Sequence, residues 1–234
     1  MKAMIFAAGL GTRLRPITNT KPKALVEING VPLLETVINR LIAAGVSEVI
    51  VNLHHFPDQI RDFVREKKNF GIRIEFSFEE TLLLDTGGGL KKAAWFFDDG
   101  QPFIIHNVDI LSNINLEKMF EHHLENKCLA TLAVNERETK RFLIFDEENL
   151  LCGWKSLHVN KEVVSRAPKG KSQDLGFCGI HVVSADIFEK ITEDGVFSII
   201  TSYMRLISAG ERIMAFRTHE NSWRDVGKLA ELEK

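Results

Sequence analysis

The sequence of 234 residues has little cysteine and little excess charge. Its three cysteines, Cys128, Cys152 and Cys178, lie far apart, form no Cys-x-x-Cys pair and are odd in number. We therefore expect three small buried side chains in a reducing compartment, the cytoplasm. The formal net charge of −2 argues against a general nucleic-acid binder, so any anion site must be local.

The sequence also lacks an apolar run of about 18 residues, the length that a membrane-spanning helix requires. Residues 1–16 contain a short apolar stretch followed by glycines and arginines instead of a cleavage site, which indicates a buried first strand and no signal peptide. Hydrophobic residues make up 44% and charged residues 26%, so global disorder is excluded. In the absence of a linker, a single domain over residues 1–234 is expected, with no membrane contact. The sequence does not decide between a monomer and a homo-oligomer.

The first half of the chain alternates strand and helix patterns. Apolar residues recur at helical spacing in residues 33–44, and residues 72–78 alternate between apolar and polar side chains. Such alternation of elements predicts an α/β fold with a Rossmann-like, mainly parallel sheet and helices on both faces. We expect strands at 2–7, 48–53, 72–78, 103–107 and 128–134, and helices at 33–44, 57–68, 88–97 and 115–126.

The second half is richer in strand patterns and predicts a β-rich lobe. Residues 156–174 are polar and lack periodicity, so we expect a mobile loop there. The expected elements are strands at 141–146, 150–154, 175–183 and 212–217, a hairpin turn at 147–149, a helix at 198–208 and a short C-terminal helix.

Residues 9–23 form the sharpest local feature of the sequence. They contain glycines and four basic residues, Arg13, Arg15, Lys21 and Lys23, but no acidic residue. Glycines allow backbone N–H groups to face an anion, and arginines add bidentate contacts to phosphate. The GxxxxGK[ST] phosphate motif is absent, and Leu14 replaces the third glycine of GxGxxG. The segment therefore predicts a phosphate site of another kind, with a solvated basic turn as the simpler alternative.

Residues 1–27 closely resemble the start of the sugar-1-phosphate nucleotidyltransferases, whose signature is GxGTRxRPxT followed by PK. Four later segments resemble, in the same order, the family's base-binding, first metal, sugar-binding and second metal segments. They are residues 84–89, 107–109, 179–180 and 223–227. The short chain and the TGGG form look most like the bacterial N-acetylmuramate α-1-phosphate uridylyltransferases, followed by mannose-1-phosphate guanylyltransferases.

The resemblance implies a site residue by residue. It assigns Arg13 and Lys23 to catalysis, Asp109 and Asp225 to Mg²⁺, and Gly153 and Gly179 to the sugar. The nucleotide residues that it implies are Ala8, Gly9, Gly11, Thr12, Arg13, Glu79, Thr86, Gly87, Gly88 and Asn107.

The substrates that the resemblance implies are a nucleoside triphosphate, with UTP favoured, and a sugar-1-phosphate, with N-acetylmuramate-1-phosphate favoured. The products would be an NDP-sugar and pyrophosphate. The nucleotide-binding half would span about 1–134, and the sugar-binding and second metal half about 135–234.

Several implied residues have simpler readings. Asp225 could instead cap a final helix begun by Val226 and Gly227, and Gly153 could mark a strand bulge. The glycines of 87–89 could form a flexible turn, or begin a helix whose N–H groups face a ligand.

The sequence also departs from the family pattern. Val108 replaces a small residue at the first metal motif, Lys228 stands where threonine is common, and the Glu-Lys-Pro sugar segment is missing. These departures leave open a second hypothesis, a catalytically silent nucleotide-sugar-binding regulatory subunit, against which the retention of Lys23, Arg13, Asp109 and Asp225 argues. Alternation along a strand instead predicts that the Val108 side chain points away from the metal into the packing of the sheet.

Overall fold

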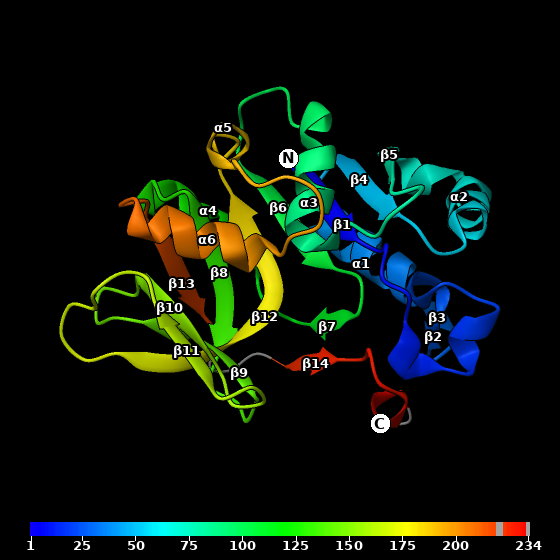
Figure 1. Ribbon diagram of the computed structural model, residues 1–234. Coiled ribbons are helices and arrows are strands. Elements are labelled where there is room, and N and C mark those ends of the chain that lie inside the picture. The colour runs from blue at the N-terminus through cyan, green and yellow to red at the C-terminus, as the bar shows by residue number, and fades with distance from the viewer. Residues whose placement is uncertain (219–221, 233–234) are drawn as a thin grey trace.

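The computed structural model describes residues 1–218 and 222–232. One sheet of ten strands has the order β11-β10-β9-β12-β6-β1-β4-β5, and β8 lies between β12 and β13 (Figure 1). The strands are β1 (Lys2–Phe6), β4 (Glu48–Leu53), β5 (Arg73–Phe78), β6 (Phe103–Asn107), β8 (Ala130–Asn135), β9 (Arg141–Phe145), β10 (Leu151–Ser156), β11 (Lys161–Val164), β12 (Gln173–Val183) and β13 (Ile213–Arg217).

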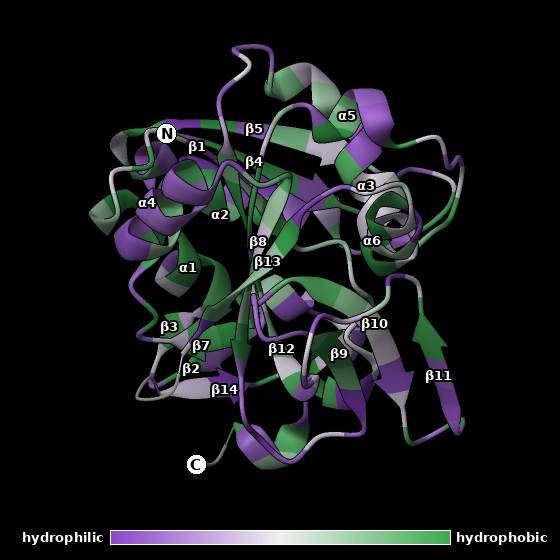
Figure 2. Cartoon of the chain, turned by 90° about the vertical axis from the view of Figure 1, so that its left-hand side faces the viewer, coloured by the Kyte–Doolittle hydropathy of each residue, from purple (hydrophilic) through white to green (hydrophobic). Residues whose placement is uncertain are grey.

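Helices cover both faces of this sheet, because successive strand residues point to opposite sides. Ala3 and Ile5 of β1 pack into the core formed with α1, α2 and α4, whereas Met4 packs into the core formed with α3, α5 and α6. Figure 2 shows apolar strands inside and polar residues on outward-facing helix surfaces. The helices are α1 (Leu33–Ala43), α2 (Pro57–Glu66), α3 (Asp85–Lys92), α4 (Leu116–Asn126), α5 (Ile187–Lys190) and α6 (Ile199–Ser208).

Strand direction divides the sheet into two parts. Strands β6, β1, β4 and β5 run parallel, so their carboxyl ends lie at one edge. Strand β12 pairs antiparallel with β6, β8 and β9, and β9, β10 and β11 form an antiparallel lobe. The predicted α/β architecture, with helices on both faces and a β-rich lobe, is confirmed.

Two small ladders flank the main sheet and were not predicted. Strand β2 (Glu27–Ile28) pairs with β3 (Val31–Pro32), and β7 (Ile110–Ser112) pairs with β14 (Trp223–Asp225). The second ladder joins segments more than 100 residues apart, so local sequence patterns carry little signal for it. It matters most here, because it brings two predicted metal motifs together.

Three expected elements need correction. The helix expected at 88–97 is α3, Asp85–Lys92, because residues 86–88 are held against the segment before α6 and can be helical despite their glycines. The expected mobile loop at 156–174 contains β11, an edge strand that pairs with β10 and whose Glu162 forms an ion pair with Lys155. Val226 and Gly227 begin no helix; the last element within the described residues is a 3₁₀ turn at Leu229–Glu231.

Two packing predictions are confirmed. All three cysteines are free and buried. Val108 is fully buried in the core that includes α1, although β6 ends at Asn107 and Val108 lies in the turn that follows, where its N–H group donates to Phe6 O over 3.2 Å. Within residues 1–218 and 222–232, no helix is long and apolar enough to cross a membrane.

Candidate active site

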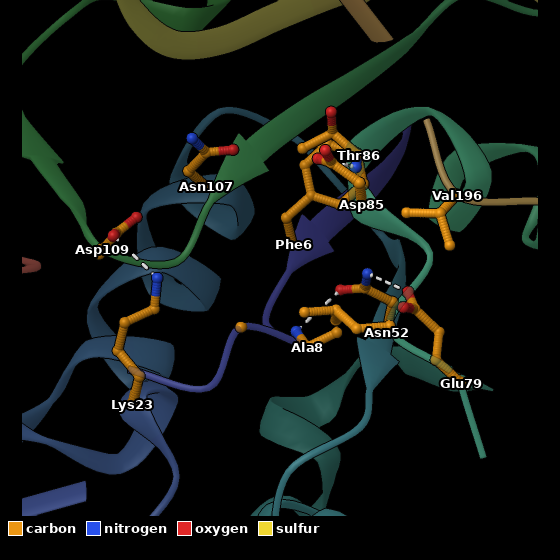
Figure 3. A pocket seen from close by; sticks show the side chains of 12 residues that line it. Phe6, Ala8, Lys23, Asn52, Glu79, Asp85, Thr86, Asn107, Asp109 and Val196 are labelled. Carbon is orange, nitrogen blue, oxygen red and sulfur yellow. Dashed lines mark hydrogen bonds and ion pairs between the residues drawn. The ribbon is translucent and has the colours of Figure 1, made fainter. Parts of the chain in front are cut away.

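A pocket of about 380 Å³ opens where β1, β4 and β6 end (Figure 3). Ligands of open α/β sheets bind beyond the carboxyl ends of the strands, so this is the expected place for a substrate. Five of the predicted nucleotide residues line it, together with Lys23 and Asp109. The lining residues are Phe6, Ala8, Gly9, Lys23, Asn52, Glu79, Leu83, Asp85, Thr86, Asn107, Asp109 and Val196.

The loop after β1 folds closely around the Lys23 side chain. Gly11 has a φ of 64°, and a Cβ there would lie 2.8 Å from Thr18 Cγ2 and 3.2 Å from Lys23 Cβ. Glycine is therefore required at position 11 both by its conformation and by the space around it. A Cβ at Gly9 would lie 3.5 Å from Lys23 Nζ, so the loop backbone approaches the ammonium group. The turn Thr12–Leu14 follows outside the pocket lining.

Lys23 and Asp109 form an ion pair inside the pocket. Lys23 Nζ donates to Asp109 Oδ2 over 2.8 Å, and the two side chains are 14% and 10% exposed. Partial burial weakens screening by water, so this pair is stronger than a surface ion pair. The contact joins the basic loop to the segment after β6, an ion pair that the sequence motifs did not predict.

Asp225 reaches the same place through the β7–β14 ladder. It pairs with Ile110, and the N–H group of Val226 donates to Asp109 O over 3.0 Å. A Cβ at Gly227 would lie 2.7 Å from Asp109 Oδ2 and 2.9 Å from Asp225 Oδ1. Both carboxylates therefore face one point beside Gly227, which explains the glycine there.

Arg13 extends over this point from the basic loop. Its Nη1 lies 3.9 Å from Asp225 Oδ2, and its Nη2 would lie 2.9 Å from a Cβ at Gly227. The Asp225 side chain caps no helix; its Oδ1 accepts the N–H group of Gly227 over 2.9 Å. The capping alternative is therefore replaced by a tight turn that holds the carboxylate toward Arg13.

The two carboxylates fit a magnesium ion. Mg²⁺ prefers oxygen ligands and is usually held by one or two carboxylates together with substrate phosphates and water. No cluster of three acidic, histidine or cysteine side chains with metal-ligand geometry occurs among the described residues. A pair of carboxylates suits an ion that completes its coordination with the phosphate groups of a substrate.

A buried network links the basic loop to the segment before α3. Asn52 Oδ1 accepts the N–H groups of Ala7 and Ala8 over 2.7 and 3.3 Å, and Asn52 Nδ2 donates to Glu79 Oε1 over 2.7 Å (Figure 3). Glu79 Oε2 accepts the N–H group of Leu84 over 2.7 Å. Sequence reasoning found Glu79 but missed Asn52, although a polar residue late in an apolar strand was an available signal.

The glycines of α3 serve close packing. A Cβ at Gly87 would lie 2.3 Å from the Phe197 ring, and the N–H groups of Gly87 and Gly88 donate to Phe197 O over 2.9 and 3.3 Å. Their N–H groups thus do not face the pocket, contrary to the helix-start expectation. Thr86 does line the pocket, and its Oγ1 accepts the N–H group of Ile199 over 3.0 Å.

The two glycines expected at the sugar lie in different surroundings. Gly179 has a φ of 75° at an irregularity of β12, and a Cβ there would lie 2.8 Å from Asn107 Nδ2. It therefore borders the first pocket through Asn107. Gly153 lies at a β-bulge of β10, where a Cβ would lie 2.2 Å from Val163 O, and it lines neither pocket.

A second pocket of about 410 Å³ lies between the antiparallel lobe and the start of α6. It adjoins the first, because Phe177 and Ser198 line it while Gly179 and Val196, two residues away in each segment, border the first. Aromatic faces and hydroxyl groups dominate it; among the residues that the structure describes, Arg141 is its one arginine and no carboxylate lines it. The lining residues are Arg141, Phe142, Leu143, Trp154, Ser156, His158, Val159, Phe177, Ser198, Ile200 and Thr201.

Buried histidines near the site are neutral. Burial lowers the pKa of His106 to about 3, helped by the nearby charge of Arg40, and burial lowers the pKa of His181 to about 3. His181 Nδ1 lies 2.9 Å from the Tyr203 hydroxyl group. These imidazoles stay unprotonated near neutral pH and act as fixed hydrogen-bonding groups.

The nucleotidyl transferase family matches residues 2–234 of this chain. With its basic loop, paired carboxylates and α/β sheet, the chain belongs to this family of sugar-1-phosphate nucleotidyltransferases. It is 31% identical over 238 residues to N-acetylmuramate alpha-1-phosphate uridylyltransferase of Caulobacter vibrioides, with coverage of 96% of this chain and 91% of the relative.

Two further similarities define the limits of this match. UTP–glucose-1-phosphate uridylyltransferase of Synechocystis is 30% identical over 228 residues, which cover 84% of this chain but only 56% of that relative. The crystal structure of a putative glucose-1-phosphate thymidylyltransferase from Bacillus anthracis matches with a TM-score of 0.82 at 15% identity. The match covers 100% of this chain and 92% of the Bacillus chain. The latter supports the fold alone.

Proposed function

We propose that this protein joins UTP to N-acetylmuramate-1-phosphate, with UDP-N-acetylmuramate and pyrophosphate as products. The observation that carries the proposal is the convergence of Lys23, Arg13, Asp109 and Asp225 at the carboxyl edge of the sheet. The uridylyltransferase of similar length supports the choice of substrates. Residues 1–134 supply most of the nucleotide side, and residues 135–234 supply the sugar side and the second carboxylate.

The reaction needs charge neutralisation more than proton transfer. A sugar phosphate, whose second pKa is about 6, is largely a dianion near neutral pH and needs no general base. Its oxygen forms a bond to the α-phosphorus of the nucleotide while the bond from that phosphorus to the pyrophosphate oxygen breaks. Pyrophosphate leaves with the electron pair of that bond, so the charges balance.

The residues of the site would act on this repulsion between two polyanions. Lys23 binds the sugar phosphate and the α-phosphate, and Arg13 binds the departing pyrophosphate. When bound between Asp109 and Asp225, Mg²⁺ supplies charge neutralisation and alignment of phosphate oxygens. Ala8, Gly9, Gly11 and Thr12 wrap the phosphates.

The walls of the site would bind the remaining parts of the substrates. Glu79, Thr86 and Asn107 border the nucleotide, and Gly87 and Gly88 support this wall from within. Gly179 borders the sugar beside the second pocket, and Gly153 shapes the lobe behind it.

The second pocket supports an acidic sugar. Aromatic faces such as Trp154 suit the apolar face of a sugar ring, and Arg141 is a cation without an acidic partner among the residues that the structure describes. The lactyl group of N-acetylmuramate carries one carboxylate that an arginine can bind. Free, buried thiols are consistent with a reducing cytoplasm.

A second candidate is guanylyl transfer to mannose-1-phosphate. It is favoured by 37% identity over 140 residues to a mannose-1-phosphate guanyltransferase of Gibberella zeae, although this covers only 59% of the chain. The two candidates differ in base and sugar but share the residues around Asp109.

Pyrophosphate release with four nucleoside triphosphates and several sugar-1-phosphates, each with and without Mg²⁺, tests the proposal. We expect the highest kcat/KM for UTP with N-acetylmuramate-1-phosphate, and loss of turnover when EDTA removes the metal. Preference for GTP with mannose-1-phosphate would support the second candidate. No turnover in any combination, with nucleotide-sugar binding retained, would instead support a silent regulatory subunit.

A further inference from the structure

A third cavity of about 290 Å³ lies between α1 and the β7–β14 ladder. Two arginines, Arg40 and Arg224, line it together with the hydroxyl groups of Thr36, Ser112 and Ser222, and no carboxylate of residues 1–218 or 222–232 lines it. Neighbouring residues of a strand point to opposite faces. Arg224 therefore faces this cavity, while the adjacent Asp225 faces the active site.

Arg40 is a largely buried cation whose partners are all neutral. Its Nη1 donates to Ser112 Oγ over 2.8 Å and to His106 Nε2 over 3.1 Å, and its Nη2 donates to Ile114 O. Burial lowers the pKa of Arg40 to about 10, so the group is still charged near neutral pH. A buried charge without a counter-ion is costly, which favours an anion close by.

Arg224 adds a second cation of the same kind. Its Nη2 donates to the backbone oxygen of Glu231, and no described acidic side chain forms an ion pair with Arg224 or Arg40. Counted over the described residues, two guanidinium groups with neutral partners give the cavity a net positive charge.

We propose that this cavity is a second anion site, which binds a small phosphate-bearing ligand. Guanidinium groups bind phosphate oxygens bidentately, and neighbouring hydroxyl groups can donate further hydrogen bonds. The site is distinct from the basic loop around Lys23, and the inference does not depend on the proposed reaction.

The same arginine connects the cavity to the first metal motif. A carbonyl oxygen only accepts, so His106 Nδ1 carries the proton that is donated to Asn107 O over 2.8 Å, and His106 Nε2 accepts from Arg40. Arg40 thus holds the end of β6 and, through Ser112, strand β7. An anion bound to Arg40 and Arg224 would join these strands to β14 and steady both carboxylates of the active site.

Titration of the full-length protein with inorganic phosphate, followed by ¹H–¹⁵N NMR at constant ionic strength, tests the site. We expect saturable shifts of the backbone amides of residues 110–113. Arg224→Gln should weaken this binding by about tenfold or more, the scale of one hydrogen bond to a charged group. Arg61→Gln, which removes an exposed arginine from α2, is the matched control and should leave it unchanged.

The basic loop is expected to bind phosphate too, so amides 8–12 are followed separately. Lys23→Ala should weaken the shifts of 8–12 while those of 110–113 persist. Shifts confined to 8–12, or equal affinity of wild type and Arg224→Gln at 110–113, would overturn the inference.

A second variant and a second ligand complete the experiment. If Arg224→Gln unfolds, Arg40→Lys keeps the charge but loses bidentate geometry, and it should also weaken binding at 110–113; unchanged affinity contradicts the site. A parallel titration with pyrophosphate separates a preference for a single phosphate from one for a diphosphate.

Discussion

The two adjoining pockets differ in how their polar groups are held. In the first, Asn52 and Glu79 form four hydrogen bonds that join three separate segments. In the second, hydroxyl and aromatic groups surround Arg141, whose guanidinium group has no acidic partner among the described residues. The polar wall of the first pocket, formed by Asn52 and Glu79, is thus organised before a substrate arrives. In the second pocket, the position of the Arg141 guanidinium group depends on the ligand. The chemistry should therefore tolerate little change, and the sugar preference more.

The strongest test of this contrast removes a charge from the first pocket. We expect Asp109→Asn to lower kcat by at least about 10²-fold, because it removes a proposed metal ligand and leaves Lys23 without its ion-pair partner. Asp225→Asn should act in the same direction. Steady-state pyrophosphate release measures the effect, with thermal melting to confirm folding. Turnover within about threefold of wild type would remove that residue from the site.

A second variant tests the cation of the same ion pair. Lys23→Ala should reduce kcat/KM by about 10²-fold, the scale for loss of one aligned charge in a site of this kind. Lys21→Ala is a matched control, since Lys21 is in the same loop but pairs with the exposed Glu27. Equal kcat/KM for the two variants would mean that position 23 has no special role.

A smaller effect is expected in the second pocket. Arg141→Gln should raise KM for N-acetylmuramate-1-phosphate by about tenfold and leave kinetics with N-acetylglucosamine-1-phosphate unchanged, because the two sugars differ in the lactyl carboxylate. Lys140→Gln changes a neighbouring cation outside the pocket and serves as control. An equal rise in KM for both sugar-1-phosphates would show that Arg141 does not select for the lactyl carboxylate.

The smallest catalytic effect is expected at Val108. Val108→Gly should cost about 1–3 kcal/mol of unfolding free energy, because it removes a buried side chain and adds backbone freedom. Its kcat should not rise. Chemical denaturation and pyrophosphate release measure both quantities, and a gain in activity would favour the silent-subunit hypothesis for the natural chain.

Much of the first pocket was predictable because its sequence signals are local. The apolar strand 2–7, the glycines and the basic residues of 9–23 lie within one stretch, and Asp109 follows a clear strand. The Asn52–Glu79 bond was not predictable in this way, since it depends on how β4 pairs with β5. A contact set by the register between strands leaves no pattern within either strand.

The glycines of residues 87–89 show a second limit of sequence reasoning. Their composition is typical of a loop or a ligand-binding turn. Only the folded positions of Phe197, Gly195 O and Glu79 show that close packing requires glycine at 87, 88 and 89 in turn. Similarly, β11 is only four residues long, two charged residues followed by two valines, so its pairing with β10 had no clear sequence signature.

The ion pair between Lys23 and Asp109 also has a thermodynamic consequence. Any cation that binds Asp109 must compete with an ammonium group 2.8 Å away, whereas a phosphate group drawn to Lys23 relieves that competition. Binding of the cation and binding of the phosphate are then linked, and each raises the affinity of the other by the same factor. The resting protein would hold metal weakly on its own, and nucleotide and metal would be taken up together. Calorimetric titration of metal with and without nucleotide would measure this linkage as a ratio of two dissociation constants.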